Sequence, residues 1–218
     1  MLRALAMALV FASQLAAHDI ITTNLTFTRD ISRIIDRHCA ACHGPSAEIP
    51  LTAYEEARPW AVAIKEQVLS RAMPPWGAVK GFGNLQPDHA LTQEEIMIVA
   101  AWVIGGAPQG DPEWLPKQAH GKSASPPPTI RGALTGGNQT TLTEAIQVAG
   151  IRPLSGSLIE SARITARLPN GAFEPLVWLY HYDPKWRQDF LFREPVNLPK
   201  GTVLETTAPV RFVLETAN

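Results

Sequence analysis

The sequence predicts a multidomain chain in which an N-terminal all-α domain is followed by a small C-terminal β-sandwich. Apolar residues recur at helical spacing as far as about residue 107, prolines cluster over the next stretch, and beyond it apolar and polar residues alternate with a period of two. We therefore divide the 218 residues into a leader (1–17), a helical domain (18–111), a proline-rich linker (112–137) and a β domain (138–218).

The first 17 residues have the three parts of a secretory signal peptide. A basic start at Arg3 is followed by an apolar run from Ala4 to Phe11 and by small residues that end at Ala17. The apolar run is too short to cross a bilayer comfortably, so we expect no transmembrane segment in the mature chain. Export to the periplasm or another outside compartment is therefore predicted. An apolar helix of the folded domain and an uncleaved membrane anchor are the rival interpretations.

Three helical stretches are predicted in the first domain. One begins at about Asp30, with Thr28 as its N-cap, and runs into a cysteine motif. The second covers about 53–72 and is interrupted by Pro59. The third begins with the capping box Thr92-Gln93-Glu94-Glu95 and ends at a pair of glycines.

In the second domain, the clearest strand signal is the alternation over 163–168, which ends at the turn Pro169-Asn170-Gly171. Further strands are expected at 173–182, 188–193 and 202–215. About 80 residues of such strands fit a small sandwich.

The run Cys39-Ala-Ala-Cys42-His43 is the pattern of covalent c-type haem attachment. Two thiols at this spacing reach the two vinyl groups on one porphyrin edge, and His43 then falls beneath the iron as the proximal ligand. One covalent haem c is therefore predicted. The alternatives are a thioredoxin-like redox pair, a zinc site and a disulfide. The first lacks its βαβ context, and the second lacks further ligands.

Met73 is the predicted distal iron ligand, so that His43 and Met73 would be the two metal-binding residues. It lies at a helix end, directly before Pro74-Pro75, where the prolines would present its thioether. A core-filling role is the alternative for Met73. His89, on a loop, is a competing ligand, whereas His38 is too near the cysteines to reach the opposite haem face. Candidate walls of the haem are Trp60, Trp76, Phe82 and above all Trp102, which are otherwise ordinary core aromatics.

Over about residues 26–107 the sequence resembles class I cytochrome c. It is similar, more specifically, to a cytochrome c domain fused to copper type II, ascorbate-dependent monooxygenase-like domains. The stretches that carry the likeness are Thr26-Phe27-Thr28-Arg29-Asp30-Ile31, Met73-Pro74-Pro75-Trp76 and Trp102-Val103-Ile104-Gly105-Gly106-Ala107-Pro108. The resemblance implies the same distal role for Met73.

The β domain resembles the end of that monooxygenase domain through Ile151-Arg152-Pro153 and Leu198-Pro199-Lys200-Gly201-Thr202. The family follows the first stretch with a His-x-His copper pair, whereas Leu154-Ser155-Gly156 stands here. No methionine follows Met97, so a thioether copper ligand is also missing. We therefore expect a degenerate docking module without catalytic copper.

Together these features predict an exported monohaem cytochrome that transfers single electrons to or from a redox protein partner. The net charge of −1 gives no basic excess for binding nucleic acid. Residues 18–112 carry 7 basic against 11 acidic residues, which would favour a basic partner. The alternatives are a haem- or copper-dependent oxidoreductase related to the ascorbate-dependent monooxygenases, and a haem-based gas sensor.

Overall fold

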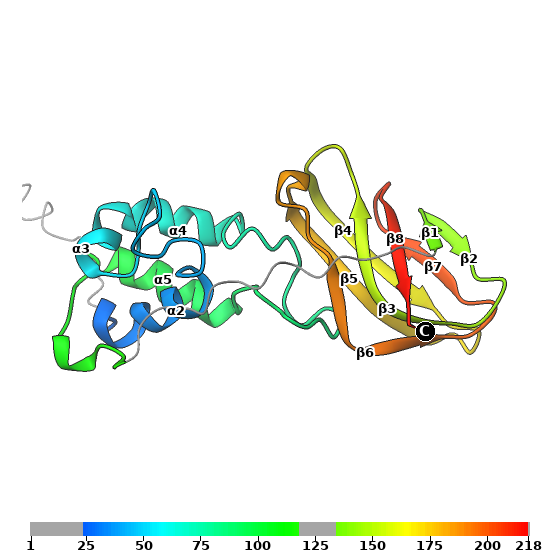
Figure 1. The fold of residues 1–218 in the computed structure, drawn as a ribbon, viewed down its shortest axis with the longest axis horizontal. Helices are drawn as coiled ribbons and strands as arrows, with labels where there is room; N and C mark the ends of the chain where they lie inside the picture. Colours follow the sequence, from blue (N-terminus) through cyan, green and yellow to red (C-terminus); the bar gives the residue numbers. More distant parts are fainter. Residues whose placement is uncertain (1–23, 118–133, 218) are drawn as a thin grey trace, which may run out of the picture.

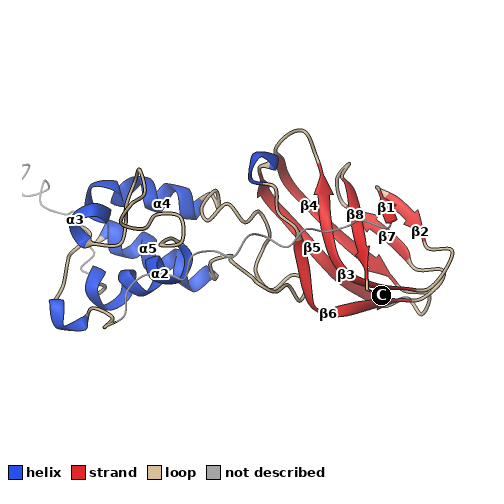
Figure 2. Ribbon diagram, in the orientation of Figure 1, coloured by secondary structure: helices blue, strands red, loops and turns tan. Residues whose placement is uncertain are grey.

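The computed structural model describes residues 24–117 and 134–217, and it confirms the predicted order of a helical part followed by a β-sandwich (Figures 1 and 2). The predicted signal peptide and residues 118–133 of the predicted linker lie outside the described residues. Within the described ranges, no helix has both the length and the apolar character needed to cross a bilayer.

The helical part consists of short helices joined by long loops. A π-helical turn at its start leads directly into α2, and a 3₁₀ turn joins α3 to α4. The elements are the π-helical turn Phe27–Ile31, α2 Ser32–His38, α3 Tyr54–Ala57, the 3₁₀ turn Arg58–Trp60, α4 Ala61–Leu69, α5 Gln93–Ile104 and a last 3₁₀ turn Pro112–Trp114.

The first helix begins earlier than predicted. Its N-cap is Thr26, whose Oγ1 accepts a hydrogen bond from the Arg29 N–H at 3.3 Å, and the cap is not Thr28. Thr28 is buried instead, because the turn packs against the chain near residue 109, where the Thr28 N–H donates to the Gln109 carbonyl.

The capping box of α5 is confirmed. The Glu95 N–H donates to Thr92 Oγ1 at 3.0 Å, and the Thr92 N–H donates to Glu95 Oε2 at 2.8 Å. Gly105 caps the other end, where its N–H donates to the Ala101 carbonyl. Two of the orphan backbone donors at the N-terminus are thus satisfied by the sequence pattern itself.

The β part is a sandwich of two four-stranded antiparallel sheets. One sheet has the order β1-β8-β3-β6 and the other has the order β2-β7-β4-β5. The strands are β1 Leu134–Gly136, β2 Gln139–Thr141, β3 Ile146–Leu154, β4 Ile159–Arg167, β5 Phe173–Tyr182, β6 Phe190–Leu198, β7 Val203–Thr206 and β8 Arg211–Thr216. β1 begins inside the range predicted as linker, and the single strand predicted at 202–215 is divided into β7 and β8.

The residues that the structure describes form two hydrophobic cores, and one loop of the helical part contributes to the second. The helical core gathers side chains such as Phe27, Ile31 and Trp102. The sandwich core contains residues of both sheets together with buried side chains from the loop between α4 and α5: Trp76, Ala78, Leu85 and Ala90. We call residues 73–91 the junction segment. In Figure 1 it runs from the end of α4 to the edges of β5 and β6.

Candidate functional site

The cysteine motif continues directly from the end of α2 as a further helical turn. The Cys39 N–H donates to the Ile35 carbonyl at 2.8 Å, and the Cys39 carbonyl then accepts from the N–H groups of Cys42 at 3.0 Å and His43 at 2.8 Å. Positions i, i+3 and i+4 of such a turn share one face. The structure therefore places the two cysteines and the histidine that the sequence singled out on one turn.

The ring of His43 is held by the loop that follows it. Its Nδ1 lies 2.8 Å from the Ile49 carbonyl oxygen, and the Leu51 N–H donates to the His43 carbonyl at 3.0 Å. A carbonyl oxygen only accepts, so Nδ1 is the donor in this contact and Nε2 is the ring nitrogen that remains for another partner. No hydrogen bond reaches Nε2 among the described residues. This is the arrangement in which metal-binding histidines are oriented by their outer neighbours.

The two cysteines are free thiols with different surroundings. Cys39 is half-buried and Cys42 is exposed. Burial raises the pKa of the Cys39 thiol to about 12, and the neighbouring Cys42 adds to the shift. Redox-active Cys-x-x-Cys pairs instead depend on a thiol whose pKa is lowered. The raised pKa of Cys39 is the opposite of this pattern.

A charged cluster joins the end of α2 to the start of α5. Glu95 Oε1 accepts from Arg37 Nη1 at 2.6 Å and lies 3.2 Å from His38 Nε2. The other ring nitrogen of His38 lies 3.2 Å from the His89 carbonyl oxygen, so both nitrogens face acceptors. His38 therefore has no free nitrogen for iron. Burial acts to raise the pKa of Glu95, but the Thr92 N–H and His38 together leave it below its usual value.

The backbone at the end of α4 determines the position of Met73. Arg71 has a positive φ of 58°, and the N–H groups of Ala72 and Met73 both donate to the Gln67 carbonyl, at 3.0 and 3.2 Å. This left-handed ending reverses the chain, as glycine often does after a helix. Arg71 Nη2 also donates to Gln93 Oε1 at 2.9 Å, which ties the reversal to the start of α5.

The half-buried side chain of Met73 lies where the helical part meets β5. It lines a cavity of about 20 Å³ with Val68, Ile96 and Tyr180, and a second cavity of about 160 Å³ with His181 and Trp186 among others. Neither of these two cavities is lined by Cys39, Cys42 or His43, so neither joins Met73 to the cysteine motif.

The competing ligand His89 packs its ring edge-on against Trp76, with the ring centroids 5.0 Å apart. Burial lowers the pKa of His89, and the charges of His38 and Lys80 lower it further, although Asp88 acts in the opposite direction. His89 is an exposed residue of the junction segment.

The candidate haem walls have other surroundings. Trp102 is fully buried in the helical core, where its Nε1 donates to the Pro108 carbonyl at 3.0 Å. Trp76 belongs to the sandwich core, and Phe82 packs against Trp178 of β5 with 5.9 Å between centroids. Trp60 is exposed. Sequence spacing did not show that the junction segment carries Trp76 into the sandwich core and Phe82 onto Trp178 of β5.

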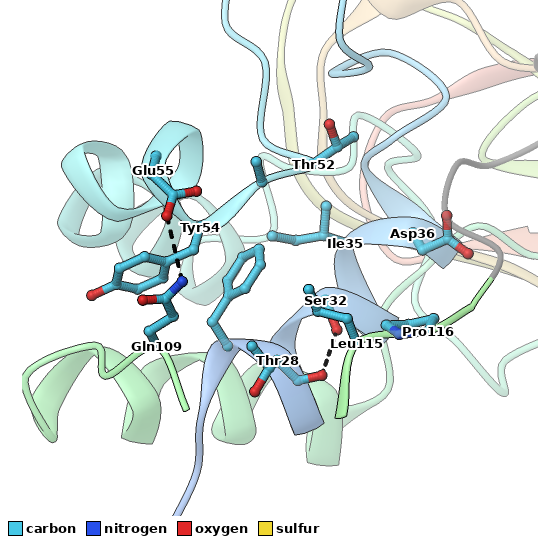
Figure 3. Close-up of a pocket in the computed structure, with 12 residues that line it drawn as sticks. Thr28, Ser32, Ile35, Asp36, Thr52, Tyr54, Glu55, Gln109, Leu115 and Pro116 are labelled. Carbon is cyan, nitrogen blue, oxygen red and sulfur yellow. Dashed lines mark hydrogen bonds between the residues drawn. The ribbon is translucent and has the colours of Figure 1, made fainter. Parts of the chain in front are cut away.

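A cavity of about 200 Å³ opens on another side of the helical part (Figure 3). Phe27 and Ile35 form apolar walls, and Glu55 accepts a hydrogen bond from Gln109 at its rim. None of the four predicted haem-binding residues lines it.

In the sandwich, the stretch 151–153 has a structural role. Arg152 of β3 makes a bidentate contact with the buried Asp189, with its Nε 2.5 Å from Oδ1 and its Nη2 3.0 Å from Oδ2. Over the described part of the chain, no group of three or more His, Cys, Asp or Glu side chains is placed to hold a metal ion. His181 Nδ1 lies 3.8 Å from Glu160 Oε2.

Comparison with protein-family models, with curated proteins and with solved structures finds no match for this chain.

Proposed function

We propose that the chain is an exported monohaem c-type cytochrome that carries single electrons. Cys39 and Cys42 would attach the haem through thioether bonds, and His43 and Met73 would be the axial iron ligands. We further infer that the helical part is a class I cytochrome c domain of the kind fused to ascorbate-dependent monooxygenase-like domains.

One observation carries this proposal: the His43 ring is fixed by the Ile49 carbonyl with Nε2 left free, beside two free thiols on the same turn. A disulfide or a redox dithiol would give no reason for an adjacent, oriented imidazole. A zinc site would need further ligands, and no cluster of three His, Cys, Asp or Glu residues occurs among the described residues. The donor set therefore fits haem best.

When bound, haem supplies an iron centre that takes up and releases one electron. The hydrogen bond to the Ile49 carbonyl fixes the ring plane of His43, so the proximal imidazole would be oriented before haem binds. Met73 offers a neutral thioether, which favours the reduced state and a high potential. The protein contributes ligands, shielding from water and a fixed geometry, and no bond of a substrate is made or broken.

The partner would be a redox protein, and the β domain would help to dock it. Support comes from the uneven charge, since residues 18–112 have a net charge of −4 and residues 113–218 have a net charge of +2. An acidic face near the haem would steer a basic partner, and this steering weakens as salt is added.

The test for covalent haem uses the mature protein, purified from cells that attach haem to exported proteins. Haem staining at the protein band after denaturing electrophoresis, and haem that stays with the protein in acid-acetone, support covalent attachment. Metal analysis should give one equivalent of iron and negligible copper. Haem that is extracted by acid-acetone contradicts the proposal. Stoichiometric copper with ascorbate-dependent oxygen consumption would favour the oxidoreductase instead.

A further inference from the structure

The junction segment completes an edge of each sheet of the sandwich. Beside β5, the Tyr180 N–H donates to the Gly77 carbonyl at 3.1 Å and the Val79 N–H donates to the Trp178 carbonyl at 2.9 Å. The residues that pair with β6 are Asn84–Gln86, through bonds from the Gln86 N–H to the Leu191 carbonyl at 2.9 Å and from the Arg193 N–H to the Asn84 carbonyl at 2.8 Å. One loop of the helical part is therefore bonded to both sheets.

The contacts that attach the junction segment to the sandwich begin within three residues of Met73. Gln188 Nε2 donates to the Pro75 carbonyl at 3.0 Å. The next residue, Trp76, is buried and meets Phe190 edge-on, with the ring centroids 4.9 Å apart. The indole N–H of Trp76 has no hydrogen-bond partner among the described residues, so this anchor acts through packing.

On its other side, Met73 is tied to the helical part. Its N–H donates to the Gln67 carbonyl at the end of α4, and Arg71 binds Gln93 at the start of α5. Met73 is thus held between two fixed points, the end of α4 and the sandwich. A short chain fixed at both ends has few conformations left, which lowers the entropic cost of keeping a side chain at a ligand position.

We propose that the β-sandwich holds Met73 in place as the distal haem ligand, with Trp76 and Gln188 as positioning residues. This inference rests on the proposed function, and it gives the sandwich a role in setting the iron potential beyond docking a partner. If the contacts between the sandwich and the junction segment were weakened, the Met73 thioether would no longer be held at the iron. The midpoint potential would then fall toward that of haem iron without a methionine ligand.

Two glycines of the junction segment provide a matched test. Gly81 and Gly83 have almost the same left-handed backbone, with φ of 80° and 79°. A Cβ at Gly83 would lie 2.1 Å from the Leu176 carbonyl oxygen of β5, whereas a Cβ at Gly81 meets nothing within 4 Å. Gly83→Ala and Gly81→Ala therefore impose similar backbone strain, but only Gly83→Ala pushes the segment away from β5.

Wild type and both variants would be compared as holoproteins by haem staining, by the methionine–iron charge-transfer band at the red edge of the visible spectrum, and by the midpoint potential. We expect Gly83→Ala to keep its covalent haem but to lose the band and to have a lower potential, while Gly81→Ala keeps both. An equal band and potential in the two variants would overturn the inference, even if Gly83→Ala unfolds more easily, because a purely structural role affects stability alone.

If Gly83→Ala does not fold, Gln188→Ala takes its place, since it removes only the bond to the Pro75 carbonyl. A smaller shift of band and potential in the same direction is expected, and values equal to those of wild type would overturn the inference. A wild-type protein without covalent haem contradicts the proposed function itself. A wild-type protein with haem but no methionine band contradicts the role of Met73.

Discussion

The Nδ1 atom of His43 lies 2.8 Å from the carbonyl oxygen of Ile49, across a loop that the Leu51 N–H closes by bonding back to the His43 carbonyl. Ring and backbone of His43, the proposed proximal ligand, are therefore fixed by hydrogen bonds within the chain. Met73, the proposed distal ligand, differs, because its position depends on contacts with the end of α4 and with the sandwich.

The first prediction concerns Met73. Met73→His should lower the midpoint potential by on the order of 100 mV or more, because an imidazole favours the oxidised iron more than a thioether does. The measurement is a redox titration followed by the visible spectrum. An unchanged potential together with an unchanged spectrum would rule out Met73 as the ligand.

Met97 provides the control for that substitution. It is the other methionine among the described residues, and its side chain is exposed on α5. Met97→His should leave the potential and the spectrum as they are in wild type. A shift in this variant would show that surface imidazoles alone affect the measurement.

The second prediction is that haem attachment supports the helical part. This part has a small core for its length, and a covalently held haem would supply much of the missing apolar contact. Cys39→Ala combined with Cys42→Ala should therefore give a helical part that is rapidly digested in limited proteolysis. The sandwich should still be protected, which separates this effect from general misfolding. A protease-resistant helical part without haem would contradict the prediction.

The third prediction concerns Glu95, which joins α2 to α5 through Arg37 and His38. Glu95→Gln should lower the free energy of unfolding by about 1–3 kcal/mol near neutral pH, since an amide replaces a buried, charge-assisted acceptor. Urea unfolding of the holoprotein measures this loss. Glu94→Gln is the control, because the neighbouring Glu94 is exposed in the same helical turn.

The same carboxylate predicts a pH dependence. The pKa of Glu95 is lowered in the folded protein. Its contribution to the free energy of unfolding is therefore complete above the ordinary pKa of about 4.3 and is lost as the pH falls through the lowered pKa. The stability difference between wild type and Glu95→Gln should therefore narrow in acid. A difference that stays constant from neutral pH down to the acid transition would contradict the lowered pKa.

The fourth prediction concerns Trp76 as part of the sandwich core. Trp76→Ala should destabilise the protein by about 3–5 kcal/mol, as large-to-small changes in a packed core do. Trp76→Phe should cost much less, because the indole N–H makes no hydrogen bond among the described residues and the aromatic contact with Phe190 is retained. Trp60→Ala, at an exposed position, should change the unfolding free energy by about 1 kcal/mol or less. Similar losses at positions 60 and 76 would argue against the anchoring of Trp76.

The fold could be predicted where local signals were complete. The Thr92–Glu95 capping box located α5, and β5 lies at the predicted residues 173–182. β3 was missed because Gly150 and Pro153 interrupt its pattern, and the pairing register shifts between Val148 and Gly150. A bulge of this kind breaks the period-two alternation on which strand prediction depends.

In the candidate site, too, features with a local sequence pattern could be predicted, and features that depend on distant segments could not. The spacing of Cys39, Cys42 and His43 was readable because all three lie on one turn. The role of the Ile49 carbonyl could not be predicted, because every residue has a carbonyl and the contact depends on the path of the loop that follows His43. The pairing of the junction segment with β5 and β6 gave no signal either, because each isolated bridge is too short to produce a periodic pattern.

The hydrogen bond from Gln188 to the Pro75 carbonyl joins residues 113 positions apart in the sequence. Contacts at such separations form late, because a long loop must close before they can contribute. During synthesis and folding, the helices around α2 and α5 have their partners nearby in the chain, whereas Trp76 must wait until β6 exists. For that interval a large apolar side chain stays without its final partners, which makes the nascent protein vulnerable to aggregation and dependent on prompt completion of the sandwich.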